Sequence, residues 1–215
     1  MGQKVNPIGF RLGVHRDWLA SWYSSVHYAD LLHQDMALRA FILGVLHRKE
    51  FLIGDILISR TASNIVITIQ YVVDDVYQDI PDKLRVHIVN KLTKFLHTQV
   101  SVRFTKCTNI YQTAIFVARH IVRLLEARVS YKEAFRRVLS KSKGYDFISG
   151  IKLRCAGRLG GEEMARAEWV KDGRLPLQSI SKNIDYGMST AHTQYGCCGV
   201  KVWLCVSSAV PSISE

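Results

Sequence analysis

The sequence predicts an α+β fold made of two α/β layers, and three observations lead to this class. Isoleucines alternate over residues 64–71, which is typical of a half-buried strand. Helical and strand patterns follow each other in both halves of the chain. The 215 residues are 48% hydrophobic and 22% charged, a composition typical of one or two globular domains that bury their own cores.

The first half is predicted to begin with an extended arm and to continue as a compact layer. Glycine and proline interrupt any periodicity over residues 1–16, so this segment cannot build a core and should lie across a partner. Pro81 marks a helix start, because proline is favoured in a first turn. The predicted elements are a helix over 28–49, strands over 55–60 and 64–71, a helix over 81–97 and a strand over 99–106. Helices would then cover one face of a three-stranded sheet.

The second half is predicted to form another layer. Ser130 and Glu133 have the spacing of a capping box, so a helix should begin at Tyr131 and end at Gly144. The remaining elements are a helix over 111–128, a strand over 151–156, a short helix over 162–170 and strands around 175–184 and 199–206. We therefore expect an arm over 1–16, domains over 17–108 and 109–206, and a tail over 207–215.

Basic residues exceed acidic ones, and much of the excess lies in the second half. The chain has 29 Lys and Arg against 18 Asp and Glu, a net charge of +11. On the helix that begins at residue 131, the cations share one arc: Lys132, Arg136, Arg137 and Lys141. Only Glu133 and Arg137 make a pair of opposite charge four residues apart. The net charge predicts a polyanionic partner, either nucleic acid or an acidic membrane surface. The arc indicates phosphate contacts, and its alternative is a helix face that is merely solvated. No apolar stretch approaches the roughly 18 residues that would predict a membrane span.

The segment 157–161, Gly-Arg-Leu-Gly-Gly, is a second candidate for phosphate binding. It lacks the Gly-Lys-Ser/Thr end of a P-loop and the spacing of a dinucleotide-binding loop, so no nucleotide cofactor is predicted. A glycine turn that opens a helix beside basic residues suits a phosphate of an RNA backbone, with contacts from Arg154, Arg158 and Arg166. The alternative is a tight turn that only packs a helix on a strand. Trp169, in the predicted helix, is interpreted as a packing residue rather than a platform for bases.

No arrangement of residues predicts catalysis, a cofactor or a metal site. The five cysteines include no C-x-x-C and no zinc-type spacing, so they are interpreted as buried, reduced thiols. His192 and Cys197 alone do not make a metal site. Glu162 and Glu163 are adjacent and cannot flank one bond as an acid and a base. The enzymatic alternative, a nucleic-acid lyase with an activated lysine, has no lysine in a recognisably desolvated context.

Four stretches together resemble one family. MGQKVNPIGFRLG, GRLGGEEMARAEWVKDGRLPL, IDYGMSTAHTQYG and GVKVW are similar to the bacterial-type small-subunit ribosomal protein uS3 family, closely over 1–13 and 148–204 and faintly over 20–107. The resemblance implies an N-terminal type II KH domain followed by a C-terminal α/β domain. It also implies a non-enzymatic place in the head of the small subunit, bound to rRNA at the channel where mRNA enters, beside ribosomal proteins uS10 and uS14.

The resemblance also assigns site residues, position by position. The N-terminal arm is expected to lie on rRNA through Gly2, Gln3, Lys4, Val5, Pro7, Gly9 and Arg11. The glycine turn adds Arg158 and Arg166, beside Arg154 from the pattern above. The mRNA entrance is assigned to Lys132, Arg136 and Arg137. The family has three cations in Phe-Arg-Arg-Ala-x-Lys, of which this chain keeps two, Lys132 and Arg136, and has Glu133 in place of the middle one. Arg137 partly compensates, so we expect mRNA contact to persist with weaker assistance to unwinding.

The first domain departs from the family at its RNA-binding loop. A KH domain clamps nucleic acid with a G-x-x-G loop, which should fall between the strand at 64–71 and Pro81. Here that stretch has no glycine and three aspartates, Asp74, Asp75 and Asp79. Side chains keep the backbone from a phosphate, and carboxylates repel it. We predict a KH-like scaffold whose degenerate loop no longer clamps RNA and which packs against neighbouring proteins.

The predicted function is therefore that of a structural constituent of the small-subunit head, which binds rRNA and lines the mRNA entrance. The alternative is a free RNA-binding regulator that is not stably bound to ribosomes, and the missing G-x-x-G loop speaks against autonomous capture of RNA. The degenerate loop and the slightly apolar composition favour an organellar ribosome in the mitochondrial matrix. The plastid stroma and the bacterial cytoplasm are the alternative locations.

Overall fold

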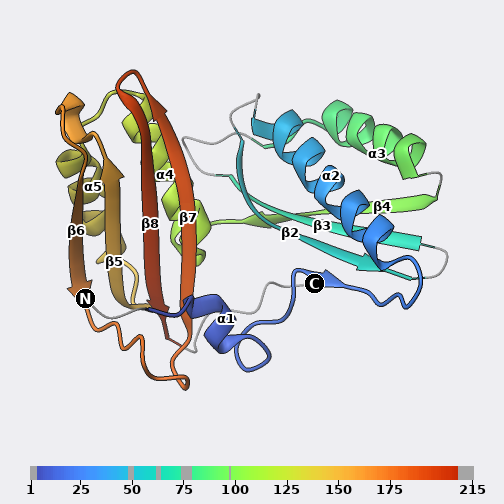
Figure 1. Cartoon of the computed structure of the whole chain (residues 1–215), viewed down its shortest axis with the longest axis horizontal. Coiled ribbons are helices and arrows are strands. Elements are labelled where there is room, and N and C mark those ends of the chain that lie inside the picture. Colours follow the sequence, from blue (N-terminus) through green and yellow to red (C-terminus); the bar gives the residue numbers. More distant parts are fainter. Residues whose placement is uncertain (1–3, 48–50, 62–63, 74–78, 97, 208–215) are drawn as a thin grey trace. The chain divides into compact units, whose positions relative to one another are not determined.

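The computed structural model of the chain describes residues 4–47, 51–61, 64–73, 79–96 and 98–207 (Figure 1). These ranges form a mixed α+β protein with two four-stranded sheets and five α-helices, which confirms the predicted class at that level. Trp18–Asn109 make one compact unit, and the residues up to Asp17 make the other together with those from Ile110 onward. We call them the N-terminal and the C-terminal unit. None of the helices in the described ranges is long and apolar enough to cross a membrane.

The N-terminal unit is a sheet covered on one face by two helices (Figure 1). In chain order its elements are β1 (Ala20–Ser21), α2 (Tyr28–His47), β2 (Leu52–Arg60), β3 (Asn64–Val72), α3 (Asp82–Leu96) and β4 (Gln99–Cys107). The sheet order is β1-β2-β3-β4, with parallel, antiparallel and parallel pairings in turn. The predicted helices and strands of this half are confirmed within the described residues, and positions 48, 49 and 97 of the predicted helices lie outside them. The sheet has four strands instead of the predicted three. The short β1 has no counterpart in the prediction, because its pairing with Ile58 and Ser59 is a distant contact without a local pattern.

Apolar side chains from both helices and the sheet fill the space between them. Leu38 and Ile42 of α2, Ile88 of α3 and Ile67 and Ile69 of β3 are fully buried in one cluster. Each such side chain contributes about 1.5–3 kcal/mol relative to an exposed one. The alternation of isoleucines in β3 therefore serves this core.

A buried ion pair joins α2 to β2. The Asp35 carboxylate is only 3% exposed, and Arg60 donates to its Oδ1 from Nε at 2.8 Å and also from Nη2. The Trp22 indole N–H donates to Asp35 Oδ2 at 2.8 Å. A buried carboxylate is costly unless its charge and hydrogen bonds are matched. Here both oxygens have donors, so the pair fixes the helix on the strand.

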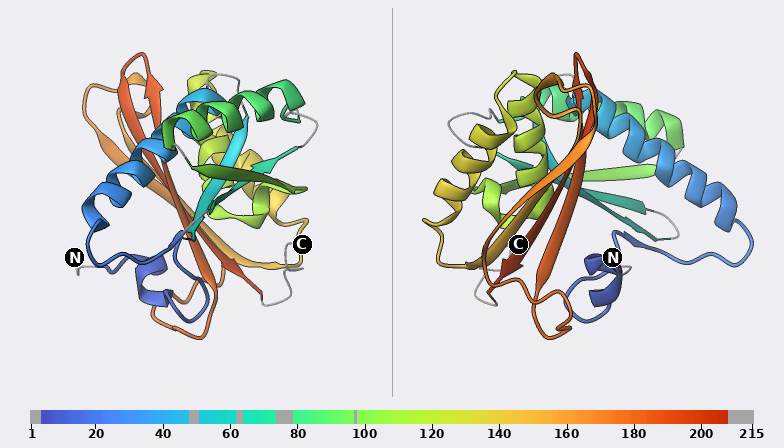
Figure 2. Two further views of the ribbon diagram at one scale, coloured as in Figure 1. Left: turned by 90° about the vertical axis from the view of Figure 1, so that its right-hand side faces the viewer. Right: turned by 60° about the vertical axis from the view of Figure 1, so that its left-hand side comes forward.

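The C-terminal unit is an antiparallel sheet with both long helices on one face (Figure 2). Its elements are α1 (Pro7–Arg11), the 3₁₀ turn η1 (Ile110–Gln112), α4 (Ala114–Glu126), α5 (Tyr131–Ser142), β5 (Ile148–Gly157), the 3₁₀ turn η2 (Leu159–Gly161), β6 (Arg166–Gly173), β7 (Ile184–Thr193) and β8 (Gly196–Val206). The sheet order is β6-β5-β8-β7. α4 packs on β7 and β8, and α5 packs on α4 and β5. A Cβ at Gly187 of β7 would lie 2.4 Å from the Ala114 carbonyl, so only glycine allows α4 to start against this strand.

Two predictions for the second half are wrong. The segment predicted as a helix over 162–170 contains β6, which pairs with β5 from Gly157↔Arg166 to Gly150↔Gly173. The hydrogen bonds and side-chain contacts of this long antiparallel ladder stabilise the strand more than the weak local helix preference of residues 162–170 stabilises a helix. The strand predicted around 175–184 is a connection, and β7 begins only at Ile184. The helix predicted from the capping box is confirmed, since the Ser130 hydroxyl accepts from the Glu133 N–H at 3.4 Å.

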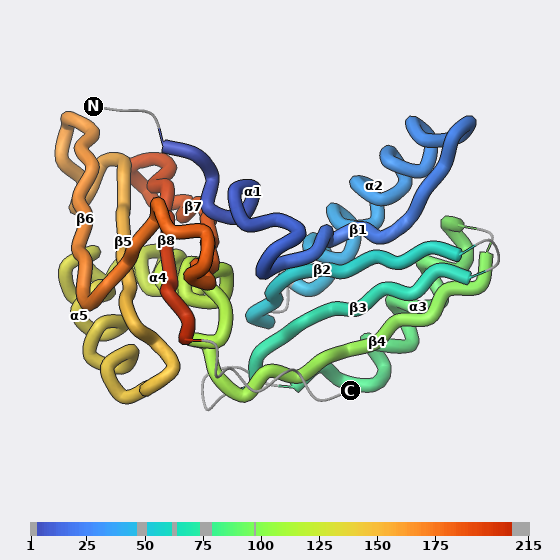
Figure 3. Tube along the Cα trace, turned by 90° about the horizontal axis from the view of Figure 1, so that it is seen from below, coloured from blue at the N-terminus to red at the C-terminus, as the bar shows by residue number. Residues whose placement is uncertain are grey.

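The N-terminal arm is not extended throughout. Asn6 caps α1 by accepting from the Ile8 N–H at 2.9 Å, and Pro7 occupies the first helical turn. α1 packs beside β7, as Figure 3 shows. The arm therefore belongs to the C-terminal unit, although its sequence shows no core of its own.

Candidate nucleic-acid interface

The glycine turn joins two neighbouring strands, β5 and β6, instead of opening a helix. Gly161 has φ of 85°, and a Cβ there would lie 2.9 Å from the Tyr195 ring. The turn consequently packs on the β7–β8 hairpin, in a place that glycine alone can fill. The predicted helix N-terminus beside a phosphate is absent from this part of the described structure. The alternative prediction of a tight packing turn is correct, except that the turn packs on the β7–β8 hairpin instead of packing a helix on a strand.

The three arginines around this turn differ in how they are used. Arg158 donates from Nε to the Glu162 carbonyl at 2.9 Å and from Nη1 to the Tyr195 carbonyl at 3.2 Å. Arg166 makes an ion pair with the Glu162 carboxylate at 2.8 Å. Arg154 is exposed on β5, and its guanidinium makes no side-chain hydrogen bond or ion pair among the described residues. Of the three guanidinium groups, that of Arg154 is the freest to bind a phosphate.

The arm places its predicted residues in different environments. Lys4, Val5 and Gly9 are exposed, whereas Pro7 is buried. The predicted contacts Gly2 and Gln3 lie outside the described residues. The exposed part of the arm that the structure describes thus retains one cation, Lys4.

Arg11 was predicted to touch rRNA, but its side chain is an internal anchor. The residue is 2% exposed, and its guanidinium donates to the carbonyls of Lys182 and Ser179 at 2.8 Å each and of Leu177 at 3.1 Å. Burial lowers the pKa of this guanidinium from its usual value. We therefore withdraw Arg11 from the RNA contacts. Its donors fix α1 on the connection that precedes β7.

The cationic arc predicted on α5 is present. Ala134, Phe135 and Val138 are buried on one side of the helix, and the charged side chains lie on the other. Lys132, Arg136, Arg137 and Lys141 are all exposed. The arc therefore presents cations to the solvent, as phosphate contacts require.

Glu133 lies within this arc and binds two of its cations. Its carboxylate accepts from Arg137 Nε at 2.9 Å and from Arg136 Nη2. Hydrogen bonds from Arg137 and Arg136 lower the pKa of the Glu133 carboxyl, so it is charged at neutral pH. The predicted Glu133–Arg137 pair is confirmed, and Arg136 joins it. The acidic substitution therefore engages the same cations that are assigned to mRNA.

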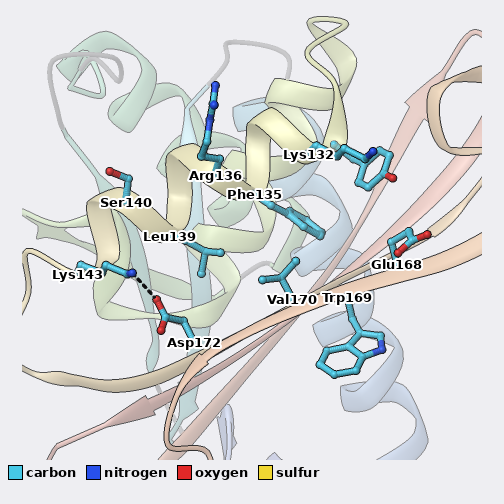
Figure 4. Close-up of a pocket in the computed structure, with 11 residues that line it drawn as sticks. Lys132, Phe135, Arg136, Leu139, Ser140, Lys143, Glu168, Trp169, Val170 and Asp172 are labelled. Carbon is cyan, nitrogen blue, oxygen red and sulfur yellow. Dashed lines mark ion pairs between the residues drawn. The ribbon is translucent and has the colours of Figure 1, made fainter.

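A groove of 520 Å³ separates α5 from β6 (Figure 4). Phe135 and Leu139 form part of its wall, and Lys143 pairs with Asp172 at 3.2 Å. Trp169 contributes to the lining of the groove, and its ring extends toward the other side of β6 (Figure 4). Because Trp169 is 59% exposed and lies on a strand, its interpretation as a packing residue of a helix is wrong.

One of the three predicted loop aspartates lies within the described residues. The Asp79 carboxylate accepts from the Tyr71 hydroxyl at 2.8 Å and from Arg85 Nη2 at 3.0 Å, and the Tyr71 hydrogen bond lowers the pKa of Asp79. Asp79 thus fastens the start of α3 to β3. Asp74 and Asp75 lie outside the described residues.

The described residues include no group of three or more His, Cys, Asp or Glu that could hold a metal ion. Four of the cysteines are buried, and burial raises the pKa of the Cys155 thiol to about 12. Cys197 is exposed, contrary to the prediction, and its Sγ lies 3.4 Å from His192 Nδ1. All five thiols are free.

Comparison with known proteins agrees with this picture. A family model described as "Ribosomal protein S3, C-terminal domain" matches residues 121–204. The small ribosomal subunit protein uS3 of Methylocella silvestris is 39% identical over 210 residues, which cover 95% of this chain and 84% of the relative. That of Gluconacetobacter diazotrophicus is 39% identical over 95% of this chain and 89% of the relative. That of Natranaerobius thermophilus is 36% identical over 100% of this chain and 93% of the relative.

The two-sheet fold, the exposed cations and these matches define a structural, non-enzymatic protein of the ribosome. Within that class, the chain belongs to the small ribosomal subunit protein uS3 family. The regulator that works apart from ribosomes is accordingly not favoured.

Proposed function

We propose that this chain binds small-subunit rRNA and mRNA in the head of the small subunit, where the C-terminal unit lines the mRNA entrance. The observation that carries the proposal is the arc of α5, where Lys132, Arg136 and Arg137 are exposed over a buried apolar face. The arc has four cations, Lys132, Arg136, Arg137 and Lys141, against the single carboxylate of Glu133, and this excess favours phosphate contacts over a merely solvated helix. Lys4, Arg154, Arg158 and Arg166 are the proposed rRNA contacts, together with Gly2, Gln3, Val5, Pro7 and Gly9 of the arm.

The N-terminal unit is, in this proposal, a KH-like domain that contacts proteins instead of clamping RNA. Its helices form an apolar groove of 420 Å³ lined by Leu38 and Phe41 of α2 and Phe95 of α3. Phe95 is 56% exposed, and Met36 of α2 is 51% exposed. Apolar surface of this kind favours a protein partner. The uS10 and uS14 proteins are the proposed neighbours.

The proposed location is a mitochondrial ribosome, with plastid and bacterial ribosomes as the alternatives. Support comes from the acidic loop segment, which departs from the family pattern. The relatives reported above are bacterial and do not decide between the compartments. Immunodetection in purified mitochondria, plastids and cytosol from the source cells distinguishes the three.

Sedimentation through sucrose gradients tests the proposed function. The full chain should migrate with the small subunit at about 50 mM salt and remain there at about 200 mM, because many phosphate contacts and buried protein contacts act together. A chain that stays near the top of the gradient at both salt concentrations would contradict the proposal and favour the regulator.

Glu133→Gln should strengthen RNA binding by the arc. Removing the carboxylate releases Arg136 and Arg137, and we expect affinity for single-stranded RNA to rise about two- to fivefold, the size of an exposed ion pair. The salt dependence should steepen by about one unit in log K against log[salt]. Fluorescence anisotropy with a labelled oligonucleotide measures both. The double variant Lys132→Glu and Arg136→Glu is the opposite control and should weaken binding and slow translation through structured mRNA. Equal affinity of Glu133→Gln and wild type would show that the arc does not contact RNA.

A further inference from the structure

The face of the C-terminal sheet that lies opposite α4 and α5 carries two adjacent rows of basic and aromatic side chains. Strand register sets the first row across β6, β5, β8 and β7 as Lys171, Lys152, Trp203 and Tyr186. The second row, one step along the strands, is Trp169, Arg154, Lys201 and Met188. Residues between these positions, such as Leu153 and Val202, are fully buried and face the helices. We call the two rows the sheet platform.

The aromatic rings of the platform lie close together with a cation between them. Lys152 Nζ is 5.0 Å from the Trp169 ring centroid and 5.3 Å from that of Trp203. The centroids of Tyr186 and Trp203 are 5.3 Å apart. Trp169 is 59% exposed, although an indole is large and apolar. The platform therefore combines flat aromatic rings with the Lys152 ammonium, which lies within cation–π distance of both tryptophans.

The charge of the platform has a single sign. Its two rows contain Lys152, Arg154, Lys171 and Lys201 and no carboxylate. Burial, followed by repulsion from Lys4, Arg154 and Lys171, lowers the pKa of the Lys152 ammonium. Glu168 and Asp172 alternate with Trp169 and Lys171 along β6, so their carboxylates lie on the other face of this strand. The cations of the platform therefore repel one another, and a bound anion would relieve this repulsion.

We propose that the sheet platform binds unpaired nucleotides of ribosomal RNA, with a base stacked on the exposed Trp169 and phosphates held by Arg154, Lys171 and Lys201. Trp203 is half-buried, packs against Leu175 and Ile184, and supports the platform from beside Lys152. This inference rests on the rRNA binding proposed above. It adds which surface binds the RNA and how the bases and phosphates are held. Aromatic side chains interleaved with cations on a sheet are the means by which single-stranded RNA is bound. The aromatic residues, Met188 and Arg154 would suit a protein partner as well, so the preference for nucleic acid rests on the three lysines, which protein interfaces disfavour, and on the absence of a carboxylate from the two rows.

The geometry favours unpaired nucleotides over a duplex. Bases inside an A-form helix stack on each other, and only bases that are splayed out can lie on an aromatic ring. A duplex would contact the platform through its phosphates alone. Removal of the exposed indole should therefore weaken single-strand binding and leave duplex binding almost unchanged.

Anisotropy titrations of the full chain test this with two labelled probes, an oligouridylate of about 12 nucleotides and a blunt RNA duplex of the same length. Trp169→Ala should weaken binding of the oligouridylate at least about fivefold. Trp169→Phe, which keeps a ring, should remain within about twofold of wild type. Tyr23→Ala removes an aromatic that is 88% exposed in the N-terminal unit and serves as the matched control without effect. Lys201→Gln should lower the slope of log K against log[salt] by about 0.7, whereas Trp169→Ala should not change it.

Ultraviolet crosslinking in purified small subunits gives a second readout. We expect nucleotides attached to peptides of β6 and β8 in wild type and their loss from β6 in Trp169→Ala. Equal oligouridylate binding by Trp169→Ala and wild type, or protein crosslinks alone on these peptides, would overturn the platform. If the variants and wild type then still sediment with the small subunit, the proposed function stands without it. If wild type neither binds RNA nor sediments with the subunit, the proposed function fails as well.

Discussion

Asp35→Ala is expected to destabilise the N-terminal unit by about 3–5 kcal/mol, the cost of leaving a buried charge without its partner. The Arg60 side chain is 8% exposed and donates to Asp35 and to Gln34 Oε1, at 3.0 Å in the second case. Without the carboxylate, the guanidinium loses its counter-charge and the Trp22 N–H loses its acceptor. Both groups would have to reach water, which requires α2 to separate from β2.

Hydrogen exchange followed by mass spectrometry measures this effect in the full chain. Peptides of α2, β2 and β3 should exchange at least about a hundredfold faster, since about 1.4 kcal/mol corresponds to a factor of ten. Asp30→Ala on the same helix is the matched control, because the Asp30 side chain is 77% exposed and contacts only His27, at 3.8 Å, among the pairs described. It should change stability by less than about 0.5 kcal/mol. Similar exchange in both variants would mean that the Asp35–Arg60 pair does not hold the helix.

Arg11→Ala is expected to cost the C-terminal unit about 3 kcal/mol, because a charged donor group leaves several carbonyls unpaired at once. The carbonyls of Leu177, Ser179 and Lys182 accept from this guanidinium, and the first turn of α1 is tied to it through the Pro7 carbonyl at 3.4 Å. The connection before β7 should loosen, and α1 should detach with it. The arm would then lose the fixed position that its RNA contacts need.

Exchange in peptides covering 174–183 and α1 checks this outcome, together with sedimentation of the variant. Arg11→Lys keeps the charge but cannot reproduce the planar fork of donors, so it should recover only a minor part of the loss. Lys182→Ala removes an exposed cation from the same connection while keeping the backbone acceptor, and it should be nearly neutral. If Arg11→Lys behaves like wild type, charge alone matters and the anchoring role is wrong.

Local sequence patterns predicted those elements whose periodicity is strong. The isoleucines of β3, the proline before α3 and the Ser130–Glu133 capping box each act within a few residues, and the structure confirms all three elements. The cationic arc of α5 was also predictable, because one helix face follows directly from residue spacing. The quoted motifs indicated the uS3 family, which the comparisons confirm.

Predictions failed where an element or side chain depends on residues far away in the chain. β6 exists because β5 offers it an eight-residue ladder, whereas its own residues suggested a helix. Arg11 looked like a solvent-facing cation, but its acceptors lie more than 160 residues away. Trp169 looked like a packing residue until the strand register placed it beside Lys152 on the open face.

The sequence by itself therefore determined the α+β class, the N-terminal layer, the excess of cations on α5 and the family. Only the tertiary structure decided which cations face solvent, which serve as internal anchors, and that Trp169, Trp203 and Lys152 share one surface. The physical reason is the range of the interactions. Helix periodicity and capping act between neighbours in sequence, whereas strand pairing and burial depend on segments that meet only when the chain has folded.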